Sequence, residues 1–199
     1  MANCVYLIGD ETSRLALVVD PAWEVPAILA AVEAAGYRLA AALLTHNHFD
    51  HVNGVEELLR AADIPVYVHR EDASAVPAGR SLKPVADGDS MSLGGLEVGF
   101  LHTPGHTAGS QCLKVEGRLL TGDTLFIDGC GRVDLPTSDP ERMGQSLRKL
   151  AALPPETEIW PGHGYSGKES ATLKSQLLSN PYLKAAALGL PDFLRLIGS

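Results

Sequence analysis

The chain has 199 residues, of which 45% are hydrophobic and 20% are charged, and its formal net charge is -8. This composition is that of an ordinary folded domain and excludes a chain that is disordered throughout. The acidic balance, with 24 acidic against 16 basic residues, argues against a nucleic-acid-binding protein, because such proteins need a basic surface.

The first predicted elements lead to a segment rich in histidine. Two apolar runs, 4–8 and 15–19, flank a turn-prone stretch and predict a strand hairpin. Residues 26–35 are rich in alanine and end at a glycine, which predicts a helix with a glycine cap. The apolar run 39–44 predicts a buried strand, and it leads directly into residues 45–51.

The rest of the chain alternates between short strands and helices. A helix is predicted at 55–62, and strands are predicted at 65–69, 91–93, 97–102, 111–115, 118–120 and 158–160. An amphipathic helix is predicted at 140–153, with proline in its first turn. The C-terminal tail, from about residue 168, is predicted to be helical at 170–188, with an interruption at Asn180-Pro181, and again at 192–196. These elements predict a single α/β domain over residues 1–199, with two sheets and helices outside them.

The segment Thr45-His46-Asn47-His48-Phe49-Asp50-His51 carries the strongest functional signal in the chain. His46 and His48 are two residues apart, so in an extended stretch both side chains project to the same side. Asp50 and His51 follow where the predicted strand gives way to a helix. Four ligand-type side chains at this spacing exceed what one tetrahedral ion needs when it keeps a position open for catalysis. The segment therefore predicts two divalent metal ions, with zinc as the first choice and iron or manganese as alternatives.

Three further ligand-type residues follow predicted strands in glycine-containing turns. His106 lies in TPGHTAGS, Asp123 in TGD and His163 in PGHG. Alone, each is more simply explained as a turn residue that makes local hydrogen bonds. Together with the segment 45–51, they predict one metal site on loops at one edge of a rigid sheet.

In this order, the motifs THNHFDH, TPGHTAGS, TGD and PGHG resemble those of the metallo-β-lactamase fold superfamily. The resemblance covers the chain from its first hairpin to about His163. It implies a four-layer αββα sandwich and a division of the ligands between two ions. By this resemblance, the first ion is held by His46, His48 and His106, the second by Asp50, His51 and His163, and Asp123 bridges both.

Within that superfamily the chain is most similar to short forms of the glyoxalase II, or hydroxyacylglutathione hydrolase, type. The resemblance implies a thioester hydrolase that acts through metal-bound hydroxide on a small-molecule or carrier-bound thioester. Asp50 and Asp123 are the predicted catalytic residues. The β-lactamases themselves typically differ at the bridging or second-metal position and are usually exported, so a lactam substrate is not expected.

Two departures from the glyoxalase II pattern leave the substrate open. Asp134 stands where the glutathione-binding version has an aromatic residue, and only residues 164–199 follow the last motif. That segment is too short for the helical domain that carries basic glutathione contacts in longer glyoxalases. The segment GCGRVD is more similar to the corresponding segment of the persulfide dioxygenases. That resemblance implies a single-iron site built from His46, His106 and Asp123. A dioxygenase of this kind is the alternative enzyme, and a metal-holding module without turnover is the third hypothesis.

Other residues are given smaller roles. Arg132 and Tyr165 are the predicted substrate-binding residues, with a surface ion pair as the alternative for Arg132. Cys130 is predicted to pack rather than to act as a nucleophile, and Lys83 is a candidate for the pocket edge. His69 and His102 are interpreted as structural, with a supporting role near His106 as the alternative for His102.

The sequence also bears on the compartment. Its three cysteines include no C-x-x-C pair, which is not the pattern of a disulfide framework. The first ten residues lack the basic and long apolar regions of a secretory signal, and no apolar run reaches about 18 residues. We expect a cytoplasmic protein that binds neither membranes nor nucleic acid.

Overall fold

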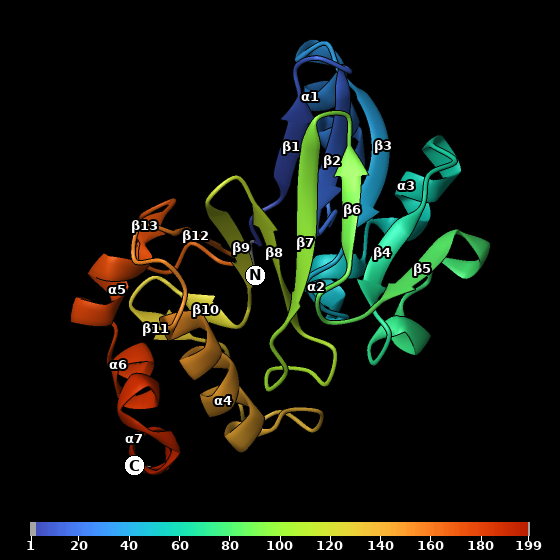
Figure 1. Cartoon of the computed structure of the whole chain (residues 1–199). Helices are drawn as coiled ribbons and strands as arrows, with labels where there is room; N and C mark the ends of the chain where they lie inside the picture. The colour runs from blue at the N-terminus through green and yellow to red at the C-terminus, as the bar shows by residue number, and fades with distance from the viewer. Residues whose placement is uncertain (1–2, 199) are drawn as a thin grey trace.

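The computed structural model describes residues 3–198 and places two β-sheets between layers of helices (Figure 1). The first sheet has the order β1-β2-β3-β4-β5, with bounds Tyr6–Asp10, Leu15–Val19, Arg38–Leu43, Val66–His69 and Leu82–Val85. The second sheet has the order β13-β12-β9-β8-β7-β6. Its strands in chain order are β6 (Ser90–Leu93), β7 (Leu96–His102), β8 (Gln111–Val115), β9 (Arg118–Gly122), β12 (Glu158–Pro161) and β13 (Ala171–Thr172). A separate ribbon pairs β10 (Leu125–Phe126) with β11 (Gly129–Cys130).

The helices gather in two groups. The first group is α1 (Val25–Ala34), α2 (Phe49–Val52) and α3 (Val55–Ala61), and the second is α4 (Pro140–Ala151), α5 (Leu173–Ser179), α6 (Pro181–Leu188) and α7 (Leu190–Ile197). Figure 1 shows α4 to α7 gathered on one side of the sheets, away from α1 and α3. Within residues 3–198, none of these helices combines the length and the apolar character that crossing a bilayer requires.

Three apolar clusters lie between the four layers. Side chains of a strand alternate between its two faces, so neighbouring residues of β2 enter different clusters. Val18 packs with residues of α1 and α3, whereas Leu17 packs between the two sheets. Leu119, Met143 and Phe193 belong to the third cluster, which joins the second sheet to α4 and to α6 and α7. The predicted αββα sandwich is confirmed.

The strand directions of the second sheet bring three loops to one edge. β7 and β9 are both antiparallel to β8, and β12 is parallel to β9, so β7, β9 and β12 run in the same direction. The chain therefore leaves all three strands at the same edge of the sheet. The turns that follow them contain His106, Asp123 and His163.

The structure corrects the predicted tail and adds elements. The prediction of a helix from residue 170 is wrong at its start, because Ala171 and Thr172 pair with β12. The helix α5 begins at Leu173, where the Thr172 side chain accepts a hydrogen bond from the Ser175 backbone N–H. The strands β5, β10 and β11 were not predicted, since they have two to four residues and show no clear apolar alternation.

Candidate metal centre

The first part of the site is the loop that leaves β3 and enters α2. His48 has an extended backbone (φ -65°, ψ 146°) and immediately precedes α2, whose first turn contains Asp50 and His51. Thr45 fixes the start of this loop, because its backbone N–H and its hydroxyl both donate to the Asp20 carboxylate, at 2.7 and 2.6 Å. The extended stretch and the helical turn thus present four ligand-type side chains from six residues.

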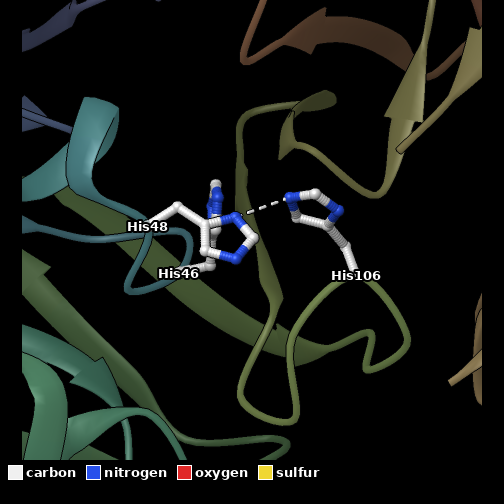
Figure 2. Close-up of side chains that lie close together, drawn as sticks. All are labelled: His46, His48 and His106. Atoms are coloured by element: carbon white, nitrogen blue, oxygen red, sulfur yellow. Dashed lines mark hydrogen bonds between the residues drawn. The ribbon is translucent and has the colours of Figure 1, made fainter. Parts of the chain in front are cut away.

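His46, His48 and His106 form the first group of converging side chains. Their ring centroids are 4.5 to 4.9 Å apart, and the rings are inclined by 74° to 89°, so they meet by their edges. His48 Nδ1 lies 2.9 Å from His106 Nε2, and Figure 2 shows these two rings facing each other from different loops. His46 Nε2 is buried and has no hydrogen-bond partner in the part of the chain described.

Asp50, His51 and His163 form the second group. His51 Nε2 lies 3.3 Å from His163 Nε2, and His163 Nε2 lies 3.5 Å from Asp50 Oδ2. Asp123 lies between the two groups. Its Oδ1 is 3.5 Å from His51 Nε2, and its Oδ2 is 3.6 Å from His106 Nε2 and 3.4 Å from His163 Nε2.

These distances fit shared metal ligands. Two nitrogen ligands of one tetrahedral ion lie about 3.3 Å apart, given metal–nitrogen bonds of about 2.0–2.1 Å. The observed separations of 2.9 to 3.6 Å bracket that value. Within residues 3–198, His46 Nε2 and Asp123 Oδ1 are buried without a hydrogen-bond partner, and such an unsatisfied atom costs about 1–3 kcal/mol. Cations coordinated by these atoms would remove that cost.

The electrostatics of His46, His48 and Asp123 point the same way. At His51, by contrast, burial is outweighed by the negative charge of Asp20 and of the other nearby carboxylates, which raise the pKa to about 9. Burial, reinforced by the neighbouring histidines, lowers the pKa of His46 well below its ordinary value, and burial and His106 lower that of His48 to about 4. Burial opposes ionisation of Asp123, but the hydrogen bond from His163 and the charge of His51 hold its pKa below its usual value. Unprotonated imidazoles and an ionised carboxylate are the forms that ligate a metal.

Second contacts orient the rings, and sequence reasoning missed them. His51 Nδ1 lies 2.9 Å from Asp20, and His106 Nδ1 lies 2.9 Å from the carbonyl oxygen of Arg132. In each ring the Nδ1–H donates outward, which leaves the Nε2 lone pair for the centre. Asp20 directly follows the strand β2 and is buried. In the sequence, the available signal was an aspartate immediately after an apolar run.

Asp72 is a second buried carboxylate that the sequence did not reveal. It accepts hydrogen bonds from Asn47 N–H at 3.0 Å, the Thr107 hydroxyl at 2.7 Å and Gly109 N–H at 2.7 Å. One side chain therefore ties the loop of His48 to the loop of His106. Its pKa is raised, because burial outweighs these hydrogen bonds.

Glycine allows the closest approach at the centre. A Cβ atom on Gly162 would collide with Asp123 Oδ1. The motif PGHG therefore has a packing reason for glycine immediately before His163.

The two groups open into a cavity of about 900 Å³ that holds both predicted substrate-binding residues. Tyr165 stacks on His163, with ring centroids 5.1 Å apart and an interplanar angle of 16°. Arg132 lines the same cavity, and it forms an ion pair with Asp134. Cys130 also lines it, and burial raises its thiol pKa to about 12, so it is not a ready nucleophile.

Three other residues that the sequence analysis discussed lie outside the metal centre and its cavity. Lys83 is on β5 and does not line this cavity, so its placement at the pocket edge is wrong. His69 and His102 stack on each other, with centroids 3.7 Å apart and rings 11° from parallel. His102 Nε2 donates to the carbonyl oxygen of Ala108 rather than reaching His106.

Comparison with known sequences gives one family and several relatives. The model of the metallo-beta-lactamase superfamily matches residues 2–163. Hydroxyacylglutathione hydrolase of Alkalilimnicola ehrlichii is 46% identical over 166 residues, which are 82% of this chain and 62% of that enzyme. A probable polyketide biosynthesis zinc-dependent hydrolase, BaeB of Bacillus velezensis, is 34% identical over 185 residues, 92% of this chain and 82% of the relative. The chain thus spans less than two thirds of the Alkalilimnicola enzyme.

Two solved structures are similar over nearly the whole chain. ETHE1 from Myxococcus xanthus has a TM-score of 0.89 and 31% identity, covering 100% of this chain and 86% of its own. TTHA1623 in a di-iron-bound form has a TM-score of 0.76 and 34% identity, covering 90% of this chain and 94% of its own.

Proposed function

The chain belongs to the metallo-beta-lactamase superfamily as one of its metal-dependent hydrolases, and we propose that the bond it cleaves is a thioester. The substrate is a small-molecule or carrier-bound acyl thioester, and the reaction takes place in the cytoplasm. Relatives named as hydroxyacylglutathione hydrolases support this assignment at up to 46% identity.

The proposed site holds two divalent ions. His46, His48 and His106 would hold the first ion, and Asp50, His51 and His163 would hold the second. Asp123 would contribute to both, and its position between the two groups carries the proposal, since Oδ1 lies 3.5 Å from His51 Nε2 and Oδ2 lies 3.6 Å from His106 Nε2. Zinc is the first choice, supported by the zinc-dependent relative, and iron is supported by the di-iron form of TTHA1623.

Two such ions supply a water ligand of lowered pKa and polarise a carbonyl oxygen. The side chains of this chain position the reactants. Asp50 lines the cavity and lies at the edge of the site, so its carboxylate is placed to accept a hydrogen bond from the attacking water and orient it. Thiolate is a good leaving group, so cleavage of a thioester demands no dedicated acid from the protein.

Metal analysis combined with a substrate panel tests the proposal. We expect about two divalent ions per chain in freshly purified protein and release of free thiol from acyl thioesters. Loss of both metal and thiol release in a chelator-treated sample, restored by added zinc, would tie the activity to the site. A protein with two ions that cleaves no thioester in the panel would overturn the proposed substrate class.

A second candidate rests on a different reading of the same side chains. His46, His106 and Asp123 provide two imidazoles and one carboxylate, the set that holds a single iron in oxygen-using enzymes. One iron per chain, with oxygen uptake on glutathione persulfide and no thioester cleavage, would favour this dioxygenase over the hydrolase.

A further inference from the structure

We propose that the cavity selects thioesters whose thiol arm is uncharged, such as an acyl-pantetheine, over thioesters of glutathione. The inference rests on the proposed thioester hydrolysis and specifies its substrate class. It comes from the walls of the cavity rather than from the metal ligands.

The walls are aromatic and apolar. The lining residues of this kind, apart from the proposed ligands, are Phe49, Phe126, Leu135, Pro136, Tyr165 and Tyr182. Phe49 is 71% exposed and Tyr165 is 67% exposed, which is unusual for large aromatic side chains. Exposed apolar surface beside a cavity marks a place where a ligand covers it.

These aromatic side chains are held in place by one another. Phe49 meets Trp23 edge to face, with centroids 5.8 Å apart. Tyr165 meets Phe126 edge to face at 5.2 Å and stacks on His163. A substrate arm in the cavity therefore meets preformed aromatic surfaces.

The backbone at Trp23 supports a functional role for the contact between Trp23 and Phe49. Trp23 has a φ of 63°, in the left-handed region that a bulky residue rarely adopts. Its N–H donates to Asn53 Oδ1 at 2.6 Å, and this bond holds the conformation. Strain of this kind persists where the surrounding structure enforces it, and such positions cluster at ligand sites.

The charges of the cavity disfavour an anionic arm. The glutathione arm carries two carboxylates and one ammonium remote from its thioester, so its net charge is about -1 at neutral pH and a cationic partner favours its binding. Among the described lining residues, Arg132 is the only lysine or arginine, and Asp134 pairs with one edge of its guanidinium: Nε and Nη2 each donate to Asp134 at 2.9 Å. Asp128 also lines the cavity, and its carboxylate is already paired with Lys168 Nζ at 4.0 Å.

The volume accommodates the proposed arm. A cavity of about 900 Å³ is at the upper end of the range of small-molecule sites, roughly 300–1,000 Å³. It has room for an acyl group at the metal ligands and an amide-containing chain along the aromatic side chains. An uncharged chain of this kind requires no counter-ion, whereas the only lysine or arginine that the described cavity lining offers to the glutathione carboxylates is Arg132, which is already paired with Asp134.

The test compares two thioesters with the same acyl group, S-lactoylpantetheine and S-lactoylglutathione, on the zinc-loaded protein. We expect kcat/KM to be at least about tenfold higher for the pantetheine ester. Equal or higher kcat/KM for the glutathione ester would overturn the inference while leaving thioester hydrolysis intact. If neither ester is cleaved, the proposed function itself fails and this inference fails with it.

Three variants locate the selectivity. Phe49→Ala and Tyr165→Ala should each raise KM for the pantetheine ester about fivefold to tenfold with unchanged zinc content, because each removes apolar contact with the arm. Leu178→Ala is the control, since this leucine is equally exposed but lies on α5 outside the cavity. Leu178→Ala should change neither KM for the pantetheine ester nor the zinc content.

Asp134→Ala tests the charge argument directly. Asp134 is largely exposed, so the substitution leaves the fold intact and releases the Arg132 guanidinium. We expect kcat/KM for the glutathione ester to rise several-fold and that for the pantetheine ester to stay constant. No change with the glutathione ester, together with unchanged KM in both aromatic variants, would overturn the proposed selection.

Discussion

The molecule contains two clusters of histidines, and they differ in how the rings meet. Five of the seven histidines converge at the candidate metal centre, and the other two, His69 and His102, stack face to face. At the centre the ring pairs His48–His106 and His51–His163 are inclined by 89° and 85°. The stacked pair is inclined by 11°, with centroids 3.7 Å apart.

This difference in orientation separates a ligand set from a packed pair. The lone pair of an imidazole nitrogen lies in the plane of its ring, so an ion must lie close to the planes of all its imidazole ligands. Rings that meet by their edges satisfy this condition, whereas two nearly parallel planes do not intersect near the rings. His69, Glu71 and His102 have ligand-type atoms within 4.8 Å of one another, yet the stacked rings cannot both direct a lone pair at one ion. Proximity of ligand types is therefore insufficient to define a site.

Removing one converging histidine should have the largest effect. We expect His106→Ala to lower kcat/KM for thioester hydrolysis by about 1,000-fold, because an ion that loses a ligand loses several kcal/mol of transition-state stabilisation. Zinc content, measured by elemental analysis, should fall in parallel.

His102→Ala is the matched control, four residues earlier in the chain and in the stacked pair. It should retain zinc and change kcat/KM by less than about twofold. Equal losses in the two variants would remove the distinction between the clusters.

The next effect concerns the carboxylate that orients His51. Asp20 lies 2.9 Å from His51 Nδ1 and is 1% exposed. Asp20→Asn should weaken zinc affinity by about 100-fold, because the amide is a poorer acceptor for the ring N–H and for the Thr45 groups. Competition with a zinc-binding dye measures the affinity. An unchanged affinity would show that the ligand loop keeps its geometry without this carboxylate.

Asp72 tests whether the two ligand loops must be tied together. We expect Asp72→Asn to weaken zinc affinity by about tenfold, because the amide cannot accept all three hydrogen bonds from Asn47, Thr107 and Gly109. Asp87→Asn is the control at the stacked pair, where Asp87 accepts a hydrogen bond from the His102 backbone N–H at 2.8 Å. It should leave zinc affinity unchanged. If Asp87→Asn weakened zinc binding as much, the effect would be one of general stability.

The candidate ligand side chains lie in short motifs with fixed spacing, and the structure brings these side chains together. His46, His48 and His51 come from a single loop, and the strand ends before Asp123 and His163 were recognisable as apolar runs. The mixture of adjacent strand pairs and helices likewise predicted two sheets with helices outside, and the resemblance to the superfamily implied the αββα sandwich.

The supporting contacts could not be predicted, because they join residues far apart in the chain. Asp72 lies 35 positions from Thr107 and 25 from Asn47, and nothing local marks its partners. The stacking of His69 on His102 has the same origin, since these residues end strands of different sheets. Such contacts depend on how the sheets pack, which periodicity within a strand does not encode.

The smallest effect is a pH dependence of stability that belongs to the stacked pair. Burial lowers the pKa of His69 to about 4, and repulsion from His102 and Arg70 adds to this, against the attraction of Glu71 and Asp87. The unfolded chain takes up this proton near pH 6.5. Between pH 6.5 and 4 the unfolded state therefore binds more protons, and the free energy of unfolding falls as the pH falls through that window.

His69→Phe preserves a ring for the stack and removes the titration. Across this window the wild type should lose about 1 kcal/mol more than the variant. Urea unfolding of both metal-free proteins at several pH values measures this difference, and the histidines of the metal centre cancel because both proteins contain them. A pH-independent difference would mean that His69 binds its proton equally in both states, so that the pair is an open surface contact rather than a buried one. A loss of unfolding free energy confined to pH 6.5–4 would show that the stacked rings of His69 and His102 are part of the packed core. A metal-binding cluster differs, because its side chains leave room for a cation.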